Sequence, residues 1–72
     1  METTVLTERE KAVLYYLGKG LKNSEISDKL NISIHTTKAH LESMYDKLGV
    51  SNRVQAVMKA VFMGLMTPED LI

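Results

Sequence analysis

The most evident chemistry in the chain lies in residues 33–47, a run without proline or glycine. This run contains both histidines and charged residues of both signs. His35, Lys38 and His40 come early in this run, whereas Glu42 and Asp46 come late. A helix carries partial positive charge at its N-terminus, so acidic side chains are favoured there and basic ones at the other end. The charge order here is the reverse. It indicates that an external anion such as a phosphate completes the first turn of this helix.

The same residues do not suit metal binding or catalysis. His35 and His40 are five positions apart, which is ~140° around a helix at ~100° per residue, whereas helical metal pairs are three or four apart. The chain has no cysteine, and its four glycines fall mostly at expected helix ends, which leaves none for a phosphate-cradling loop. There is no nucleophile elbow, and each serine serves better as a helix cap. We therefore expect no catalytic residue, no metal and no cofactor, and we exclude an enzyme.

Length and composition are those of one small domain that spans residues 1–72. Apolar residues make up 44% of the chain, which supports a core, and nine basic residues balance nine acidic ones. Three of the acids, Glu2, Glu69 and Asp70, lie in the terminal segments, so the middle of the chain is basic. No apolar run reaches the ~18 residues that cross a membrane, and the N-terminus does not resemble a signal peptide. The lack of cysteine is compatible with a cytoplasmic location.

Capping and stop signals predict an all-α chain. Thr7 and Glu10 form a capping box before the first helix. Ser33 caps the third helix and Gly49 ends it. For the second helix, the predicted cap is either Asn23 or Ser24. For the fourth helix, it is either Ser51 or Asn52. The predicted helices cover residues 8–19, 24–30, 34–48 and 52–63, and a short turn follows at the C-terminus.

Only three residues link the second predicted helix to the third, which is the spacing of a helix-turn-helix. In such units the second helix of the pair enters the major groove of DNA. The buried side of this helix is predicted to hold Ile34, Thr37, Leu41, Met44, Tyr45 and Leu48. The fourth helix also starts with a base, Arg53, so two helix N-termini with added bases suit a phosphate-binding surface. The predicted fold is a tetrahelical helix-turn-helix bundle.

The fourth predicted helix has more apolar residues than a core-facing stripe needs. Ala56, Val57, Ala60 and Val61 can face the core, and Val54, Met58, Phe62 and Leu65 then form a second stripe. Too few residues follow to cover this stripe, so we expect a partner surface, and a two-fold homodimer is the commonest form. The predicted dimer interface comprises Val54, Met58, Val61 and Phe62.

Several segments of the chain resemble the LuxR-type DNA-binding domain, also called NarL/FixJ or GerE-type. The resemblance extends from Leu6 to Leu65, and its ordered spacing is highly specific. It rests on residues 6–10 (LTERE), 22–27 (KNSEIS), 36–41 (TTKAHL) and 47–53 (KLGVSNR), on Ala56 and on Gly64 with Leu65. The resemblance implies four helices, binding of double-stranded DNA with the third helix in the major groove, and a homodimer through the fourth.

The resemblance also assigns residues to the DNA. Lys38 matches the family lysine that reaches bases, and Ala39 and Glu42 match the neighbouring base-facing positions. Backbone contacts are expected from three short groups: Asn23 and Ser24; His35, Thr36 and His40; and Ser51, Asn52 and Arg53. A bacterial, cytoplasmic protein that associates with the nucleoid when it binds DNA is expected.

Three residues depart from the family pattern. The family usually has alanine at Ser27 and valine at Thr37, and both hydroxyls are expected at buried sites where each needs a partner, such as a carbonyl one turn back. At Glu42 many members have a polar or basic residue. Three roles stay open for this carboxylate: accepting from cytosine N4, pairing with Lys38, or repelling DNA.

Two further alternatives stay open. The rival function is a protein–protein interaction module that uses the apolar stripe of the fourth helix. The chain is either a stand-alone regulator that starts at Met1 or a DNA-binding domain excised from a protein with a receiver or ligand-sensing domain.

Overall fold

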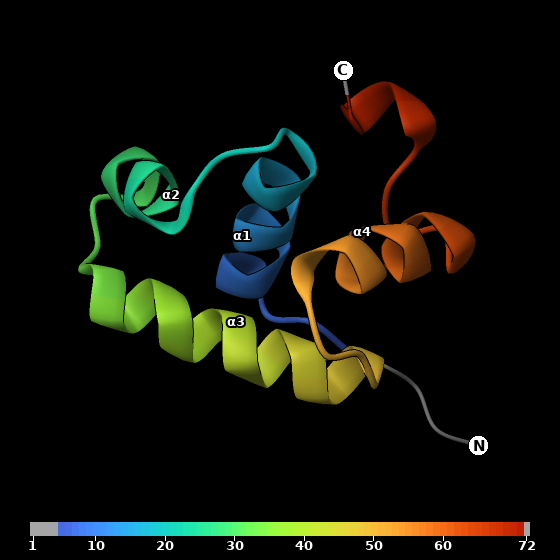
Figure 1. Cartoon of the computed structure of the whole chain (residues 1–72), viewed down its shortest axis with the longest axis horizontal. Coiled ribbons are helices and arrows are strands. Elements are labelled where there is room, and N and C mark those ends of the chain that lie inside the picture. The colour runs from blue at the N-terminus through green and yellow to red at the C-terminus, as the bar shows by residue number, and fades with distance from the viewer. Residues whose placement is uncertain (1–4, 72) are drawn as a thin grey trace.

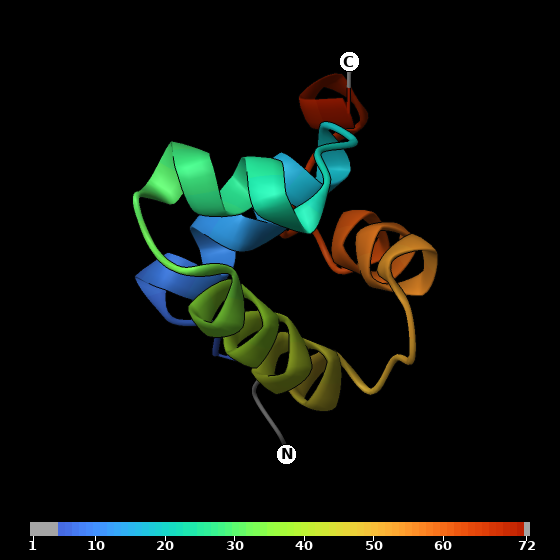
Figure 2. The same cartoon turned by 60° about the vertical axis from the view of Figure 1, so that its left-hand side comes forward.

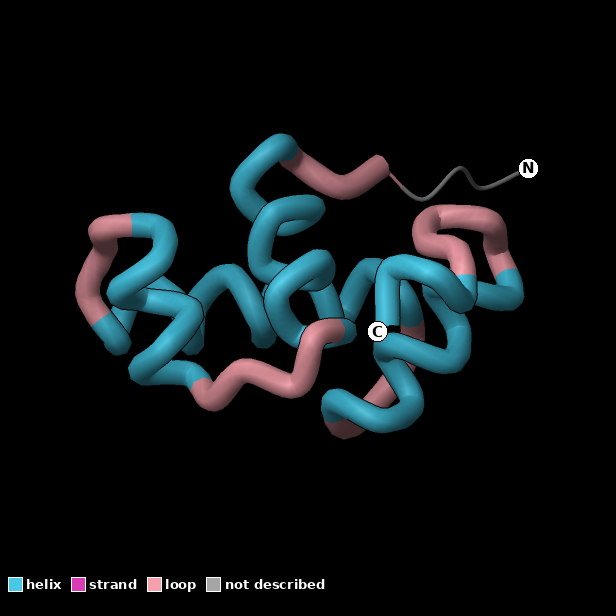
Figure 3. Tube along the Cα trace, turned by 90° about the horizontal axis from the view of Figure 1, so that it is seen from above, coloured by secondary structure: helices cyan, strands magenta, loops and turns pink. Residues whose placement is uncertain are grey.

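The computed structural model describes residues 5–71 and has, along this part of the chain, only helices and connecting loops (Figures 1 and 3). The elements are α1 (Glu8–Gly18), α2 (Asn23–Leu30), α3 (Ile34–Leu48), α4 (Arg53–Phe62) and the short 3-10 helix η1 (Pro68–Leu71). The predicted all-α fold with four helices is thus confirmed. Met1, named above as the start of a stand-alone regulator, and Glu2, counted above among the terminal acids, lie outside the described residues.

Local capping sets where α1 and α2 begin. The Thr7 hydroxyl accepts from the Glu10 amide at 3.1 Å, and a Glu10 carboxylate oxygen accepts from the Thr7 amide at 2.8 Å, so the predicted capping box is confirmed. The prediction for α2 was wrong, because the helix starts at Asn23 and the capping position is Lys22. There the Glu25 side chain accepts from the Lys22 amide at 2.7 Å, and Lys22 itself makes no side-chain capping bond.

The end of α2, both ends of α3 and the start of α4 follow the sequence signals. Ser33 accepts from the Thr36 amide at 3.0 Å, so it is the predicted cap. Asn31 has φ of 55° and Gly49 has φ of 70°, and both residue types tolerate this left-handed conformation. Asn52 is the cap of α4, since its side chain accepts from the Gln55 amide at 2.9 Å.

Helix α1 lies at the centre of the bundle and contacts every other element (Figures 1 and 2). Helices α2 and α4 flank it, and α3 crosses below. The core is built from buried side chains of all four helices and of the segments before α1 and after α4: Leu6, Val13, Leu14, Leu17, Ile26, Leu41, Met44, Leu48, Ala56, Ala60 and Met66. This packing holds α3 across the bundle with one side free.

Two expectations about burial need correction. Ile34 was expected in the core, but it is 44% exposed, because the first turn of α3 extends past α1 (Figure 1). Tyr45 is only half-buried and packs at the edge of the core. The remaining predicted core residues of α3 are buried.

Candidate nucleic-acid interface

A cleft lies where α2, α3 and α4 meet. It is lined by side chains from all three helices: Asn23 of α2, Lys38, Leu41, Glu42 and Tyr45 of α3, and Arg53 of α4. Four of these residues, Asn23, Lys38, Glu42 and Arg53, are among the predicted DNA contacts. Tyr45 was predicted only as a core residue. Its spacing of seven from Lys38, two helical turns, is the signal that could have placed it on this surface.

Arg53 joins the start of α4 to the start of α2. Its Nη1 donates to the Leu21 carbonyl oxygen at 2.9 Å, and its Nη2 donates to Asn23 Oδ1 at 2.8 Å. A guanidinium has five N–H donors, so others remain for an external anion. The two bonds bring together two helix N-termini, whose positive dipole ends favour anions.

The two hydroxyls that depart from the family pattern bond to each other in the core. Ser27 Oγ donates to the Asn23 carbonyl oxygen at 2.9 Å, one turn back as predicted. Ser27 Oγ and Thr37 Oγ1 are 2.7 Å apart, and Thr37 must donate there because the Ser27 proton is already used. Both side chains are therefore satisfied, and the pair joins α2 to α3 next to the cleft.

The free side of α3 presents the predicted base-reading residues. His35, Lys38, Ala39 and Glu42 are all exposed. Lys38 and Glu42 are one turn apart, yet the described residues contain no ion pair between them. The helical order with the base before the acid is the weaker one for such a pair.

Thr36 and His40, two of the predicted backbone contacts, lie elsewhere on α3. They are half-buried and sit ~160° around the helix from Lys38, on its other flank. The Thr36 hydroxyl accepts from the Ser33 hydroxyl at 2.9 Å. Ser24, Ser51 and Asn52 are exposed at the starts of α2 and α4. The predicted contacts thus form two groups, one at the starts of α2 and α4 and one on the flank of α3 away from Lys38.

A buried carboxylate of α1 fixes the position of α3. Glu10 of α1 is 3% exposed. It accepts from the Ser43 hydroxyl at 2.6 Å and from Lys47 Nζ at 2.8 Å, in addition to its bond with the Thr7 amide. Burial alone would raise the pKa of Glu10, but the bonds from Lys47, Ser43 and Thr7 and the charge of Lys47 outweigh it and lower the pKa to about 2. We predicted Glu10 only as a cap, and its bonds to α3 were missed.

The second apolar stripe of α4 is open to solvent. Val54, Met58 and Phe62 are 63%, 66% and 91% exposed, and Met58 and Phe62 line a shallow groove with Val50. Val61, which we also assigned to the dimer interface, is half-buried and packs on the core. Only part of its side chain is free for a partner.

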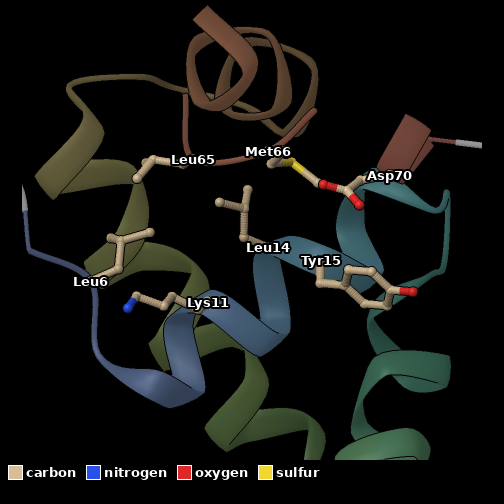
Figure 4. Close-up of a pocket in the computed structure, with 7 residues that line it drawn as sticks. All are labelled: Leu6, Lys11, Leu14, Tyr15, Leu65, Met66 and Asp70. Atoms are coloured by element: carbon tan, nitrogen blue, oxygen red, sulfur yellow. The ribbon is translucent and has the colours of Figure 1, made fainter. Parts of the chain in front are cut away.

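A separate apolar pocket lies between α1 and the C-terminal segment. Figure 4 shows Leu6, Leu14, Leu65 and Met66 around it, with Lys11, Tyr15 and Asp70 also lining it. A Cβ on the nearby Gly18 would lie 2.5 Å from the Met66 methyl carbon, so a larger residue at position 18 would require the Met66 side chain to shift. This pocket shares no residue with the cleft between α2, α3 and α4.

Neither a metal centre nor a membrane span emerges from residues 5–71. Within that range no three His, Cys, Asp or Glu residues are grouped so that they could hold a metal ion. None of the described helices is long and apolar enough to cross a membrane.

Solved structures of two regulators have the same fold. The response regulator ChrA of a heme-sensing two-component system superposes with a TM-score of 0.85 and is 39% identical, over 92% of this chain and 33% of its own. The transcription factor GerE superposes with a TM-score of 0.80 and is 30% identical, over 92% of this chain and 97% of its own.

Sequence comparisons give the same relationship. The transcriptional regulatory protein YdfI of Bacillus subtilis is 44% identical over 67 residues, which are 93% of this chain and 32% of YdfI. The nitrate/nitrite response regulator NarP of Escherichia coli is 47% identical over 55 residues, which are 76% of this chain and 26% of NarP. The chain thus spans a third or less of these two relatives. These relatives are regulators and not enzymes, in line with the prediction. The family of bacterial regulatory proteins described as the luxR family matches residues 4–60, and the chain belongs to this family.

Proposed function

We propose that this domain binds double-stranded DNA and regulates transcription, with α3 in the major groove. The observation that carries the proposal is the convergence of three helices on one cleft. Lys38 and Glu42 of α3 lie beside the starts of α2 and α4, which Arg53 holds together. An exposed helix beside two helix N-termini fits a groove whose flanking phosphates those N-termini can contact.

In this proposal the two groups of residues have different roles. Lys38, Ala39 and Glu42 face base edges, because they are exposed and lie between the first turn and the middle of α3. Asn23, Ser24, Ser51, Asn52 and Arg53 contact phosphates on one side, and His35, Thr36 and His40 do so nearer the first turn of α3. Phosphate contacts set the orientation of the protein and carry no sequence information.

We further propose that the domain binds DNA as a homodimer through α4. The exposed Val54, Met58 and Phe62 support it, because an apolar stripe of this kind is uncommon on a monomer. Two-fold dimers place half-sites about 34–36 Å apart, one helical turn of DNA, or at multiples of this distance. The same stripe favours the second candidate, a protein–protein interaction module whose α3 surface has no DNA partner.

Salt dependence separates the two candidates. Affinity for a mixed pool of duplexes is measured between 50 and 200 mM salt. Log affinity falls by about 0.9 per neutralised phosphate for each log unit of salt, so two phosphates, one for Arg53 of each copy, predict at least about a tenfold loss. Affinity that stays flat over this range, or no binding at all, would favour the interaction module.

A further inference from the structure

Glu42 is an unpaired carboxylate in the middle of the proposed base-reading surface. It is exposed, and within the described part of the chain it takes part in no ion pair and no hydrogen bond. Neither of the two cations that line the same cleft, Lys38 and Arg53, forms an ion pair with it. Across the cleft, the Arg53 guanidinium bonds to Leu21 and Asn23, and Lys38 precedes Glu42 in the less favourable order for a helical pair.

A free carboxylate between phosphates is repelled by them, so it lowers the affinity for DNA unless a donor meets it. An ionised carboxylate is an acceptor only. In the major groove, guanine presents only acceptors, and thymine presents an acceptor and a methyl group. Adenine presents an amino group beside the acceptor N7, whereas cytosine presents its N4 amino group as its only polar feature. Of the four bases, cytosine therefore suits this carboxylate best.

We propose that Glu42 is a specificity-determining residue that selects a cytosine by accepting a hydrogen bond from N4. The inference rests on the proposed function and names the DNA sequence that the same surface reads. Glu42 lies four residues, or ~6 Å, along the helix from Lys38. Since this distance exceeds the ~3.4 Å between base pairs, Glu42 can reach a different base pair from the guanine that Lys38 suits.

The test is selection from a pool of randomised duplexes, followed by sequencing, with the native chain, Glu42→Gln and Glu42→Ala. The native chain should enrich a motif with cytosine in one column. Glutamine can bond adenine N6 and N7, so Glu42→Gln should move that column from cytosine to adenine, by about tenfold or more in relative affinity. Glu42→Ala should flatten the same column, and the guanine column should stay in both variants.

Asp46→Asn is the matched control. Asp46 is also exposed and lies one turn beyond Glu42, so this variant removes the same charge from the same side of α3. Asp46→Asn should strengthen binding to all sequences by the same factor and leave the selected motif unchanged. If Glu42→Gln behaves in the same way, Glu42 only repels DNA and the inference is overturned, while the proposed function stands. If the native chain enriches no motif, the proposed function itself fails and the inference fails with it.

Discussion

Glu10 shows how one side chain can serve both local and tertiary structure. It closes the first turn of α1 by bonding the Thr7 amide, and the same carboxylate bonds Ser43 and Lys47 of α3. The bonds to α3 connect residues that are more than thirty positions apart, so they fix how α3 lies against α1. Removing one partner of a buried pair is costly, because the other charge stays behind without compensation.

We predict that Glu10 makes stability depend on acid. Its pKa is about 2 in the folded chain against an ordinary value of 4.5, so the contribution is complete above the ordinary value and is lost as the pH falls from there through about 2. The difference between these two pKa values corresponds to at most about 3 kcal/mol of unfolding free energy, since one pKa unit is 1.36 kcal/mol. Urea unfolding of the native chain and of Glu10→Gln at pH 7 and pH 3 measures it. Glu10→Gln should be less stable at pH 7, and the difference should shrink at pH 3. A difference that does not change with pH would contradict the assignment.

Other residue-scale features could be predicted only in part. The Thr7–Glu10 capping box and the Ser33 cap lie within four residues, so the sequence predicts them. A partner for the Ser27 hydroxyl was predicted one turn back and is found there. The bond between Ser27 and Thr37 could not be predicted, because it depends on how α2 and α3 cross.

Among the elements, α4 has the surface that most requires a partner. Ala56 and Ala60 are buried, whereas Val54, Met58 and Phe62 on the other side are exposed. Periodicity alone predicted one buried and one exposed apolar side, because the apolar residues extend around more of this helix than a core-facing stripe needs. The bonds from Arg53, the first residue of α4, to the start of α2 were not predictable, since they depend on how distant segments cross.

We predict that a charge on the exposed stripe leaves the monomer folded. Met58→Asp should change helical content and the thermal midpoint little, whereas Leu41→Asp, at a buried position, should unfold the domain because an unpaired carboxylate is costly to bury. Circular dichroism compares the two variants. Met58→Asp should also bind a single half-site as the native chain does and lose tight binding to two half-sites. If Met58→Asp melts like Leu41→Asp, the stripe belongs to the core.

For the whole molecule, the distribution of charge matters more than its sum. The net formal charge is zero, yet no acidic residue lies in the first turn of α3 or of α4. Acids occupy the first turns of α1, α2 and η1 instead. Of the two helix starts next to the cleft, that of α4 thus has no acid to compete with an anion, whereas the first turn of α2 carries Glu25.

The fold of the whole molecule was predictable because its signals are short-range. Caps, glycines and apolar spacing mark each helix, and the three-residue link limits how α2 and α3 cross. The convergence of Asn23, Lys38, Glu42 and Arg53 on one cleft was implied by the family resemblance. No signal within a single segment predicts it, because the residues come from three helices that meet only in the folded domain.

The central claim is that the exposed face of α3 reads DNA, and the affinity of Lys38→Ala for a selected duplex and for random duplex tests it most directly. Lys38→Ala should lose about 1–3 kcal/mol on the selected duplex and much less on random duplex, with relaxed preference at one base pair. Lys11→Ala is the control, because Lys11 carries the same charge and lines the separate pocket of Figure 4. It should leave the ratio of the two affinities unchanged. Equal losses on both duplexes for Lys38→Ala, or losses no larger than those of Lys11→Ala, would contradict the claim.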